Sequence, residues 1–285
     1  MKAVLIAPTA HIGEFEGPVE GSIGMALMGQ TIDPEYTAAY KRLAELGQYV
    51  ILDNGVYEKV SYTFHEVFAM ATAMGASEIV MPDDMNQMFQ TTIAVRDGLV
   101  AYNQHLSRGG DIIRPMYVPH GENPSLYYTC VVQILQLHDM FMPGVPFTLG
   151  VSRCYEAFPG GRYRIIENTY DKLRHLRGDF EVHLLGWGRD LADVPFIAED
   201  FPWVRSVDTA KPFNWAMIYE DLQQLSPLQR EPRREIEYFD RTLNSSQRAV
   251  AWRNVGAFML ACKGTQLEAR AGVKPATRRS QAEPA

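Results

Sequence analysis

Residues 63–84 read TFHEVFAMATAMGASEIVMPDD and contain the unit from which the fold can be inferred. Apolar residues recur there at the three- and four-residue spacing of one buried helical face: Phe64, Val67, Phe68, Ala71 and Met74. Gly75 then interrupts the periodicity, and the short apolar run Glu78–Met81 is typical of a buried strand. Asp83 and Asp84 follow directly. The stretch predicts a helix that leads through a glycine into a strand with carboxylates at its end.

The same alternation of short apolar runs and longer amphipathic segments continues along the chain. The expected strands are Ala3–Ala7, Tyr49–Asp53, Glu78–Met81, Ile112–Val118, Phe147–Val151, Glu181–Leu185 and Trp203–Val207. The expected helices are Pro34–Leu46, Thr63–Met74, Gln90–Leu106, Ser125–His138, Tyr163–Leu176 and Asn214–Leu225. Strands that alternate with helices predict a parallel sheet with right-handed crossovers.

Seven such strands are visible, and we expect a TIM-type (β/α)8 barrel. The eighth strand either lies between Tyr238 and Ser245, or the barrel closes irregularly at this strand. A further helix, Ser246–Ala261, would then pack on the outside or seal the barrel. No linker or internal repeat divides the sequence, so we expect a single catalytic barrel domain over residues 1–262. Residues 263–285 combine Gly, Pro, Ser and charge without apolar periodicity, which indicates a flexible basic tail.

The composition is that of a soluble globular protein, with 46% hydrophobic and 21% charged residues in a chain of 285. The apolar start ends at Pro8, and no later apolar run is long enough to span a membrane. We therefore expect a cytoplasmic protein (in the host cytoplasm if it is phage-encoded) with no membrane association. Three scattered cysteines form no CxxC pair, which argues against a cysteine-based zinc site and against a disulfide scaffold: Cys130, Cys154 and Cys262.

The formal net charge of −7, from 27 basic and 34 acidic residues, counts against strong non-specific binding to nucleic acid. Such binders usually carry an excess of Lys and Arg that neutralises phosphates. The position of the charges alters this conclusion, since several acids lie at strand ends while basic residues gather after Gly150 and in the tail. The charge distribution is therefore compatible with a site-specific, salt-sensitive contact with nucleic acid.

Polar residues gather directly after the expected strands. These segments are Asp53-Asn54-Gly55, Pro82-Asp83-Asp84, Pro119-His120-Gly121-Glu122-Asn123, Gly150-Val151-Ser152-Arg153, Gly186-Trp187-Gly188 and Asp208-Thr209-Ala210-Lys211. In barrels and open α/β sheets, ligands bind at the carboxyl ends of the strands. We therefore expect these residues to converge on one mouth of the barrel.

Four carboxylates in this set admit several chemistries: Asp53, Asp83, Asp84 and Asp208. They could bind Mg²⁺ or Ca²⁺, or one could act as a nucleophile and another as general acid or base. Each could also be no more than the N-cap of the next helix. Zinc would prefer histidine, and only His120 and His183 lie near strand ends. Spacing along the chain does not choose among these chemistries.

In this order, the motifs resemble those of the tRNA-guanine transglycosylase superfamily, most closely its compact phage-type branch, which exchanges guanine in DNA for a 7-deazaguanine. The matching segments are Asp53-Asn54-Gly55-Val56-Tyr57, Ile79-Val80-Met81-Pro82-Asp83-Asp84, Val118-Pro119-His120-Gly121, Leu149-Gly150-Val151, His183-Leu184-Leu185-Gly186-Trp187-Gly188 and Val204-Arg205-Ser206-Val207-Asp208-Thr209-Ala210-Lys211-Pro212. His120 replaces the glutamine of the family's Val-Gln-Gly motif. The C-terminal Cys/His zinc site of the tRNA enzymes is missing, which favours the small DNA-directed branch or a simpler substrate.

The resemblance implies a pentosyltransferase that exchanges bases by double displacement and needs no metal or redox cofactor. It implies Asp208 as the nucleophile and Asp53 as the general acid and base, with Asp84 or Asp83 reading the base. The residues implied to bind substrate are Asp84, Asp83, His120, Gly121, Gly150, Gly186, Asn54 and Lys211. The partners would be DNA, with tRNA as the alternative, and a 7-deazaguanine base such as preQ0 or a derivative.

Contacts to phosphate would then fall to basic residues near the strand ends and to the tail: Arg205, Lys211, Arg153, Arg162 and Arg164. The alternatives to base exchange are a metal-dependent barrel hydrolase, a catalytically silent nucleic-acid-binding barrel, and a glycosidase, which also uses two carboxylates.

Overall fold

The computed structural model describes residues 1–16, 23–56, 62–158, 161–173, 180–187, 191, 193–225 and 238–264. Among the residues considered above, Tyr57, positions 174–176 at the end of an expected helix, Gly188 and positions 265–285 of the expected tail lie outside this described part.

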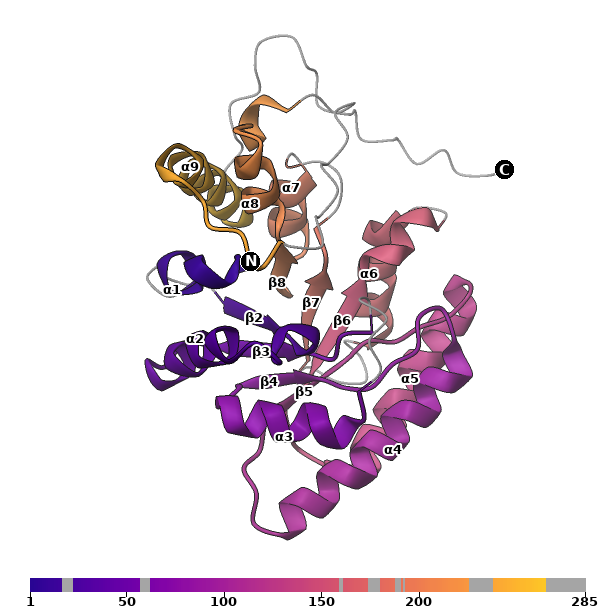
Figure 1. Ribbon diagram of the computed structural model, residues 1–285. Helices are drawn as coiled ribbons and strands as arrows, with labels where there is room; N and C mark the ends of the chain where they lie inside the picture. The colour runs from indigo at the N-terminus through magenta and orange to yellow at the C-terminus, as the bar shows by residue number, and fades with distance from the viewer. Residues whose placement is uncertain are drawn as a thin grey trace, which may run out of the picture.

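Eight parallel strands form a closed barrel in the order β1 to β8 (Figure 1). They are β1 Lys2–Leu5, β2 Ile23–Leu27, β3 Val50–Asp53, β4 Glu78–Val80, β5 Arg114–Tyr117, β6 Thr148–Ser152, β7 Glu181–Leu185 and β8 Val204–Thr209. The first and last strands close the barrel, with Val4 of β1 opposite Asp208 of β8. The expected TIM-type barrel is therefore confirmed.

The eighth strand is not where the sequence indicated. Instead of lying between Tyr238 and Ser245, it is β2, which directly follows β1 in the barrel. All of its residues are buried, but Gly24 weakens the apolar pattern. A Cβ at Gly24 would lie 3.1 Å from a carboxylate oxygen of Glu16 and 3.2 Å from the ring of Tyr40. The small residue is thus required by packing from outside the strand, which the local sequence does not reveal.

Nine α-helices lie in the described part of the chain. They are α1 Ile12–Phe15, α2 Pro34–Glu45, α3 Phe64–Met74, α4 Met88–Ser107, α5 Pro124–Phe141, α6 Gly161–Leu173, α7 Asp193–Asp200, α8 Lys211–Met217 and α9 Ser245–Cys262. Short 3₁₀ turns cover Thr9–His11, Met28–Gln30, Arg153–Ala157 and Leu222–Gln224. The seven expected helices are present, and α1 and α7 are additional.

Local sequence explains where helices begin and end. At α3, the Thr63 hydroxyl accepts from the Glu66 amide while the Glu66 carboxylate accepts from Thr63, and Gly75 ends the helix at φ +73°. The expected helix Asn214–Leu225 is shorter than predicted, because α8 ends at Met217 and Tyr219 has a positive φ of 64°. That break cannot be read from apolar periodicity.

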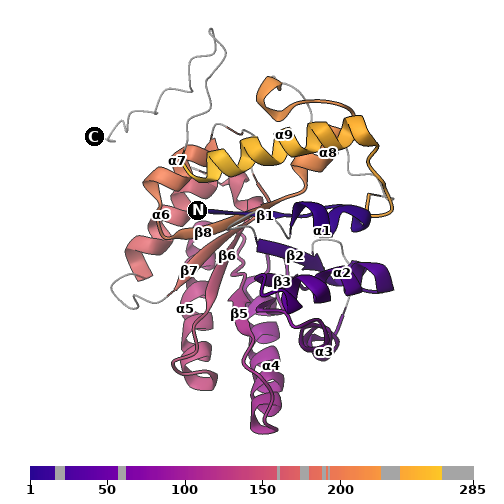
Figure 2. The same ribbon diagram turned by 90° about the vertical axis from the view of Figure 1, so that its left-hand side faces the viewer.

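Helix α9 packs on the outside of the barrel. It contacts α7, α8 and β1, and Figure 2 shows it running alongside α8. Its Phe258 ring lies 5.2 Å from that of Trp187, and its Trp252 ring lies 4.6 Å from that of Phe15. Of the two expected positions for this helix, the outer one is therefore correct. No helix in the described ranges is long and apolar enough to cross a membrane.

The amino ends of the strands are joined by a polar cluster built around the buried Glu78–Arg205 pair. We call this cluster the floor, and it consists of Tyr49, Glu78, Arg114, Glu181 and Arg205. Both carboxylate oxygens of Glu78 accept from Arg205, at 2.7 and 3.2 Å. Glu181 accepts from Arg205 at 3.2 Å and forms an ion pair with Arg114 at 3.0 Å. The expectation that Arg205 contacts phosphate is wrong, because its guanidinium is held at the end of the barrel opposite to the mouth.

Strands β7 and β8 pair with a register shift. Val182 lies opposite Val204, but His183 lies opposite Ser206, so Arg205 is an extra residue in β8. Such a bulge reverses the alternation of side chains between the two faces of a strand. Ser206, and Asp208 two residues later, thereby face the side of the sheet that carries His183.

Candidate active site

The predicted residues lie on elements that end at one face of the barrel. Asp53 ends β3, Asp83 and Asp84 follow β4, His120 and Gly121 follow β5, Gly150 lies within β6, Gly186 follows β7, and Asp208 lies near the end of β8. Because all strands are parallel, these positions share the mouth formed by the carboxyl ends. Hydrogen bonds join the predicted residues in two groups, one around Asp208 and one around Asp83.

Asp208 is held through one of its two oxygens. Its Oδ1 accepts from the backbone N–H of Gly186 at 2.7 Å and lies 3.2 Å from Nε2 of His183. Within the described residues, no hydrogen bond engages Oδ2. Only 9% of the Asp208 side chain is exposed. Hydrogen bonds from two donors offset the cost of burying Oδ1, while Oδ2 remains available to react.

His183 contacts Asp208 and Ser206. The sequence indicated His183 only as a histidine near a strand end, and neither residue was expected to act in base exchange. His183 Nδ1 lies 2.8 Å from the hydroxyl oxygen of Ser206, and both side chains are fully buried. A sequence signal existed for His183, because a polar residue in the middle of a short apolar strand is unusual in a core. Ser206 had no such signal, since its orientation depends on the bulge in β8.

Arg162 supports the turn that carries Gly186. Its Nη2 donates to the carbonyl oxygens of Val151 and Leu185, at 2.5 and 3.0 Å, and its Nη1 donates to that of Gly186. Burial lowers the pKa of Arg162 to about 10, and the Asp208 carboxylate acts in the opposite direction. The expectation that Arg162 contacts phosphate is wrong, because its guanidinium is buried among these backbone carbonyls.

The second group centres on Asp83. Its Oδ1 accepts from Nδ2 of Asn54 at 2.6 Å, and its Oδ2 lies 2.7 Å from Nε2 of His120. Asn54 also donates to the carbonyl of Met81 at 2.9 Å, which ties the turn after β3 to the end of β4. Asp84 is exposed, and its backbone bonds with the Thr91 hydroxyl at the start of α4. Of the two neighbouring carboxylates, only Asp83 belongs to this network.

His120 is 1% exposed and bridges β4 to the segment after β6. Its Nδ1 lies 3.3 Å from the hydroxyl of Tyr155, which itself donates to the carbonyl of Pro119 at 2.9 Å. Burial alone would lower the pKa of His120, but hydrogen bonds to Asp83 and Cys154 outweigh it and raise the pKa to about 9. The ring is thus held at both nitrogens, by Asp83 on Nε2 and by the Tyr155 hydroxyl and the backbone N–H of Asn86 on Nδ1.

Asp53 is half-buried, and its Oδ2 accepts from the backbone N–H of Gly55 at 3.1 Å. Lys211 starts α8, with its ammonium 4.5 Å from the ring centroid of Trp187. Both of these side chains are nearly buried, which favours a cation–π contact. Trp187 therefore packs against Lys211 and against Phe258 of α9.

Two glycines of the predicted set are required by close packing. A Cβ at Gly121 would lie 2.3 Å from the backbone nitrogen of Tyr127, so no larger residue fits there without movement of α5. A Cβ at Gly150 would lie 2.9 Å from Val118 and 3.1 Å from Leu185. Gly186 has a φ of +71°, which only glycine adopts readily.

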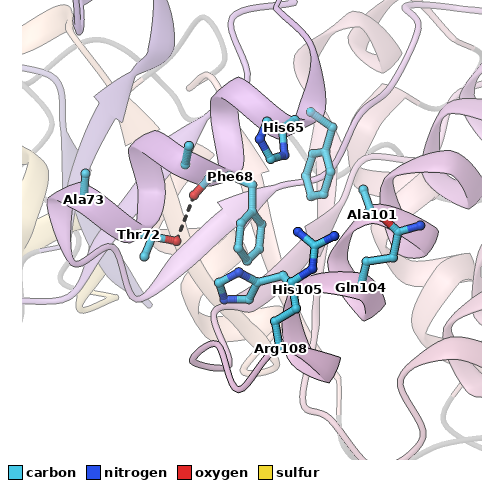
Figure 3. A pocket seen from close by; sticks show the side chains of 10 residues that line it. His65, Phe68, Thr72, Ala73, Ala101, Gln104, His105 and Arg108 are labelled. Atoms are coloured by element: carbon cyan, nitrogen blue, oxygen red, sulfur yellow. Dashed lines mark hydrogen bonds between the residues drawn. The ribbon is translucent and has the colours of Figure 1, made fainter.

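A separate groove of about 550 Å³ lies between α3 and α4 (Figure 3). Phe68 and His105 pack edge to face there, with ring centroids 4.5 Å apart. None of the predicted site residues lines this groove. Among the described residues, no group of three or more His, Cys, Asp and Glu side chains is arranged to hold a metal ion.

The sequence matches no model of a known protein family, and it finds no match among curated proteins.

Proposed function

We propose that the protein is a base-exchange glycosyltransferase that replaces guanine in DNA with a 7-deazaguanine through a covalent aspartyl–sugar intermediate. The observation that carries the proposal is the arrangement of Asp208 at the mouth of a closed barrel. One of its oxygens is fixed by two nitrogens, and the other is left for attack. The resemblance of the strand-end motifs gives the class of substrate.

The proposed reaction has two displacements. Oδ2 of Asp208 attacks C1′ of a deoxyguanosine, the C1′–N9 bond breaks, and guanine leaves with the bonding pair and receives a proton from Asp53. The ring nitrogen of the incoming 7-deazaguanine then attacks C1′ and loses its proton to Asp53, and the C1′–Asp208 bond breaks. The first displacement leaves Asp53 deprotonated, as the second requires, and the second displacement restores its proton.

We assign recognition of the base to Asp83 in preference to Asp84. A carboxylate accepts hydrogen bonds from the N1–H and amino group of guanine, and each oxygen has a second lone pair when one is already bonded. Support for Asp83 comes from its fixed position between Asn54 and His120, whereas Asp84 is exposed and outside the network. An acceptor that is already held in place loses less conformational entropy when the base binds.

DNA reaches such a site only as a flipped-out nucleotide or a single strand. Of the basic residues considered for phosphate contacts, Arg205 and Arg162 are occupied elsewhere. Arg153 is exposed beside the mouth, where its stem packs on Gly186. We retain the exposed Arg153 and Arg164 as candidates for phosphate contacts, whereas Lys211 is nearly buried with its ammonium over the Trp187 ring.

Incubation with radiolabelled guanine and either DNA or tRNA tests this function, because label is taken up only by the polymer whose base is exchanged. We expect label in DNA, and Asp208→Asn should abolish it while the matched surface variant Asp97→Asn leaves it unchanged. Uptake into tRNA would redirect the proposal to RNA. Uptake into neither polymer, or hydrolysis that EDTA stops and Mg²⁺ restores, would overturn base exchange and favour the hydrolase.

A further inference from the structure

A continuous chain of hydrogen bonds runs inside the barrel from the floor to Asp208. Arg205, bound by Glu78 at the floor, also donates from Nε to the hydroxyl oxygen of Ser206 at 3.2 Å. The same oxygen lies 2.8 Å from Nδ1 of His183, and Nε2 of that ring lies 3.2 Å from Oδ1 of Asp208. All of these side chains are at least nine-tenths buried.

The residues at the two ends of this hydrogen-bond network determine which atoms donate and which accept. Arginine can only donate, so it occupies a lone pair of the Ser206 oxygen and leaves the hydroxyl hydrogen for another acceptor. At the other end, the Asp208 carboxylate can only accept, so Nε2 of His183 must carry a hydrogen. A neutral ring with Nε2–H has a lone pair on Nδ1, which is the acceptor that the Ser206 hydroxyl requires.

From this geometry we infer that His183 is a positioning residue, held as its Nε2–H tautomer by Ser206, which fixes Oδ1 of Asp208 and presents Oδ2 for attack. The inference rests on the proposed function for its catalytic part. It adds that the bulge at Arg205 has a role in catalysis, since a regular strand would turn Ser206 and Asp208 away from His183.

The tautomer can be measured without any activity. In ¹⁵N-histidine-labelled protein, with the His183 signals assigned by their loss in His183→Gln, we expect protonated Nε2 and unprotonated Nδ1. A ring that carries its proton on Nδ1, or on both nitrogens, would overturn the inference whatever reaction the protein catalyses. Failure of base exchange in the unaltered protein would instead count against the proposed function alone.

The kinetics of base exchange test the positioning role of His183. Ser206→Ala removes the donor to Nδ1, and we expect kcat to fall about 10- to 100-fold with little change in KM, since the interaction orients a nucleophile rather than holds substrate. Ser206→Thr keeps the hydroxyl and should restore most of the rate. The matched control Ser77→Ala removes the hydroxyl that accepts from the Val50 amide at the floor and should leave kcat unchanged. An unchanged kcat in folded Ser206→Ala would contradict the role.

Discussion

Neutralising Glu78 should destabilise the barrel strongly although this residue lies far from the mouth. Glu78 is fully buried, binds Arg205 through both oxygens, and accepts from the Tyr49 hydroxyl at 2.5 Å. Glu78→Gln leaves the Arg205 charge, whose side chain is only 10% exposed, with Glu181 as its remaining acidic partner in the floor. Breaking one side of a buried ion pair typically costs about 3–5 kcal/mol.

Glu181 moderates this cost, because its carboxylate stays 3.2 Å from Arg205 and is shared with Arg114. Its side chain is 42% exposed, so solvent screens it. We therefore expect Glu78→Gln to lower the free energy of unfolding by about 3 kcal/mol, the lower end of that range. Urea denaturation followed by the fluorescence of the four tryptophans measures it.

Two further variants make the measurement decisive. Glu78→Met combined with Arg205→Met removes both charges and should recover most of the loss, because an apolar pair avoids the cost of an unpaired buried charge. Asp97→Asn breaks an exposed ion pair with Arg96 and should change the free energy of unfolding by less than about 1 kcal/mol. A loss below about 1 kcal/mol for Glu78→Gln, equal to that surface control, would refute the reasoning.

Three more variants test the packing of the barrel. Burial raises the pKa of Glu16 to about 8, so the folded state binds an extra proton and stability falls as pH rises from about 4.5 to 8. Glu16→Gln should flatten that dependence in urea midpoints and stabilise the protein at pH 8 by on the order of 4 kcal/mol; an unchanged pH slope would contradict this. Gly121→Ala should lower the free energy of unfolding by about 1–3 kcal/mol through the clash with Tyr127, whereas the control Gly256→Ala, with nothing within 4 Å of its new Cβ, should raise it by about 0.5–1 kcal/mol. Arg162→Met leaves three backbone carbonyls without their donor and should cost about 1–3 kcal/mol for each carbonyl that stays unsatisfied, read as a lower melting temperature; equal melting temperatures would refute the buried role.

Seven strands and the principal helices could be predicted because their signals are local. Apolar periodicity, the Thr63–Glu66 capping box and the glycine at position 75 all act within a few residues. Strand β2 could not be predicted in this way. Its Gly24 is dictated by Glu16 and by Tyr40 of α2, so the reason for its sequence lies in tertiary contacts.

The same division applies to the site. The rule that ligands meet the carboxyl ends of strands predicted the positions of Asp53, Asp83 and Asp208 at one mouth. It could not separate Asp83 from Asp84, because neighbouring side chains diverge according to the local backbone. It also missed His183 and Ser206, which meet only because a bulge shifts the register of β8.

The most direct test of the central claim is a search for the covalent intermediate. DNA is incubated with the protein in the absence of an incoming base, and denatured protein is analysed by gel shift and by peptide mapping. We predict a DNA–protein adduct on the peptide that contains Asp208, released when a 7-deazaguanine base is added and absent in Asp208→Asn. An adduct on another residue, or base exchange that proceeds at the normal rate in Asp208→Asn, would contradict the account.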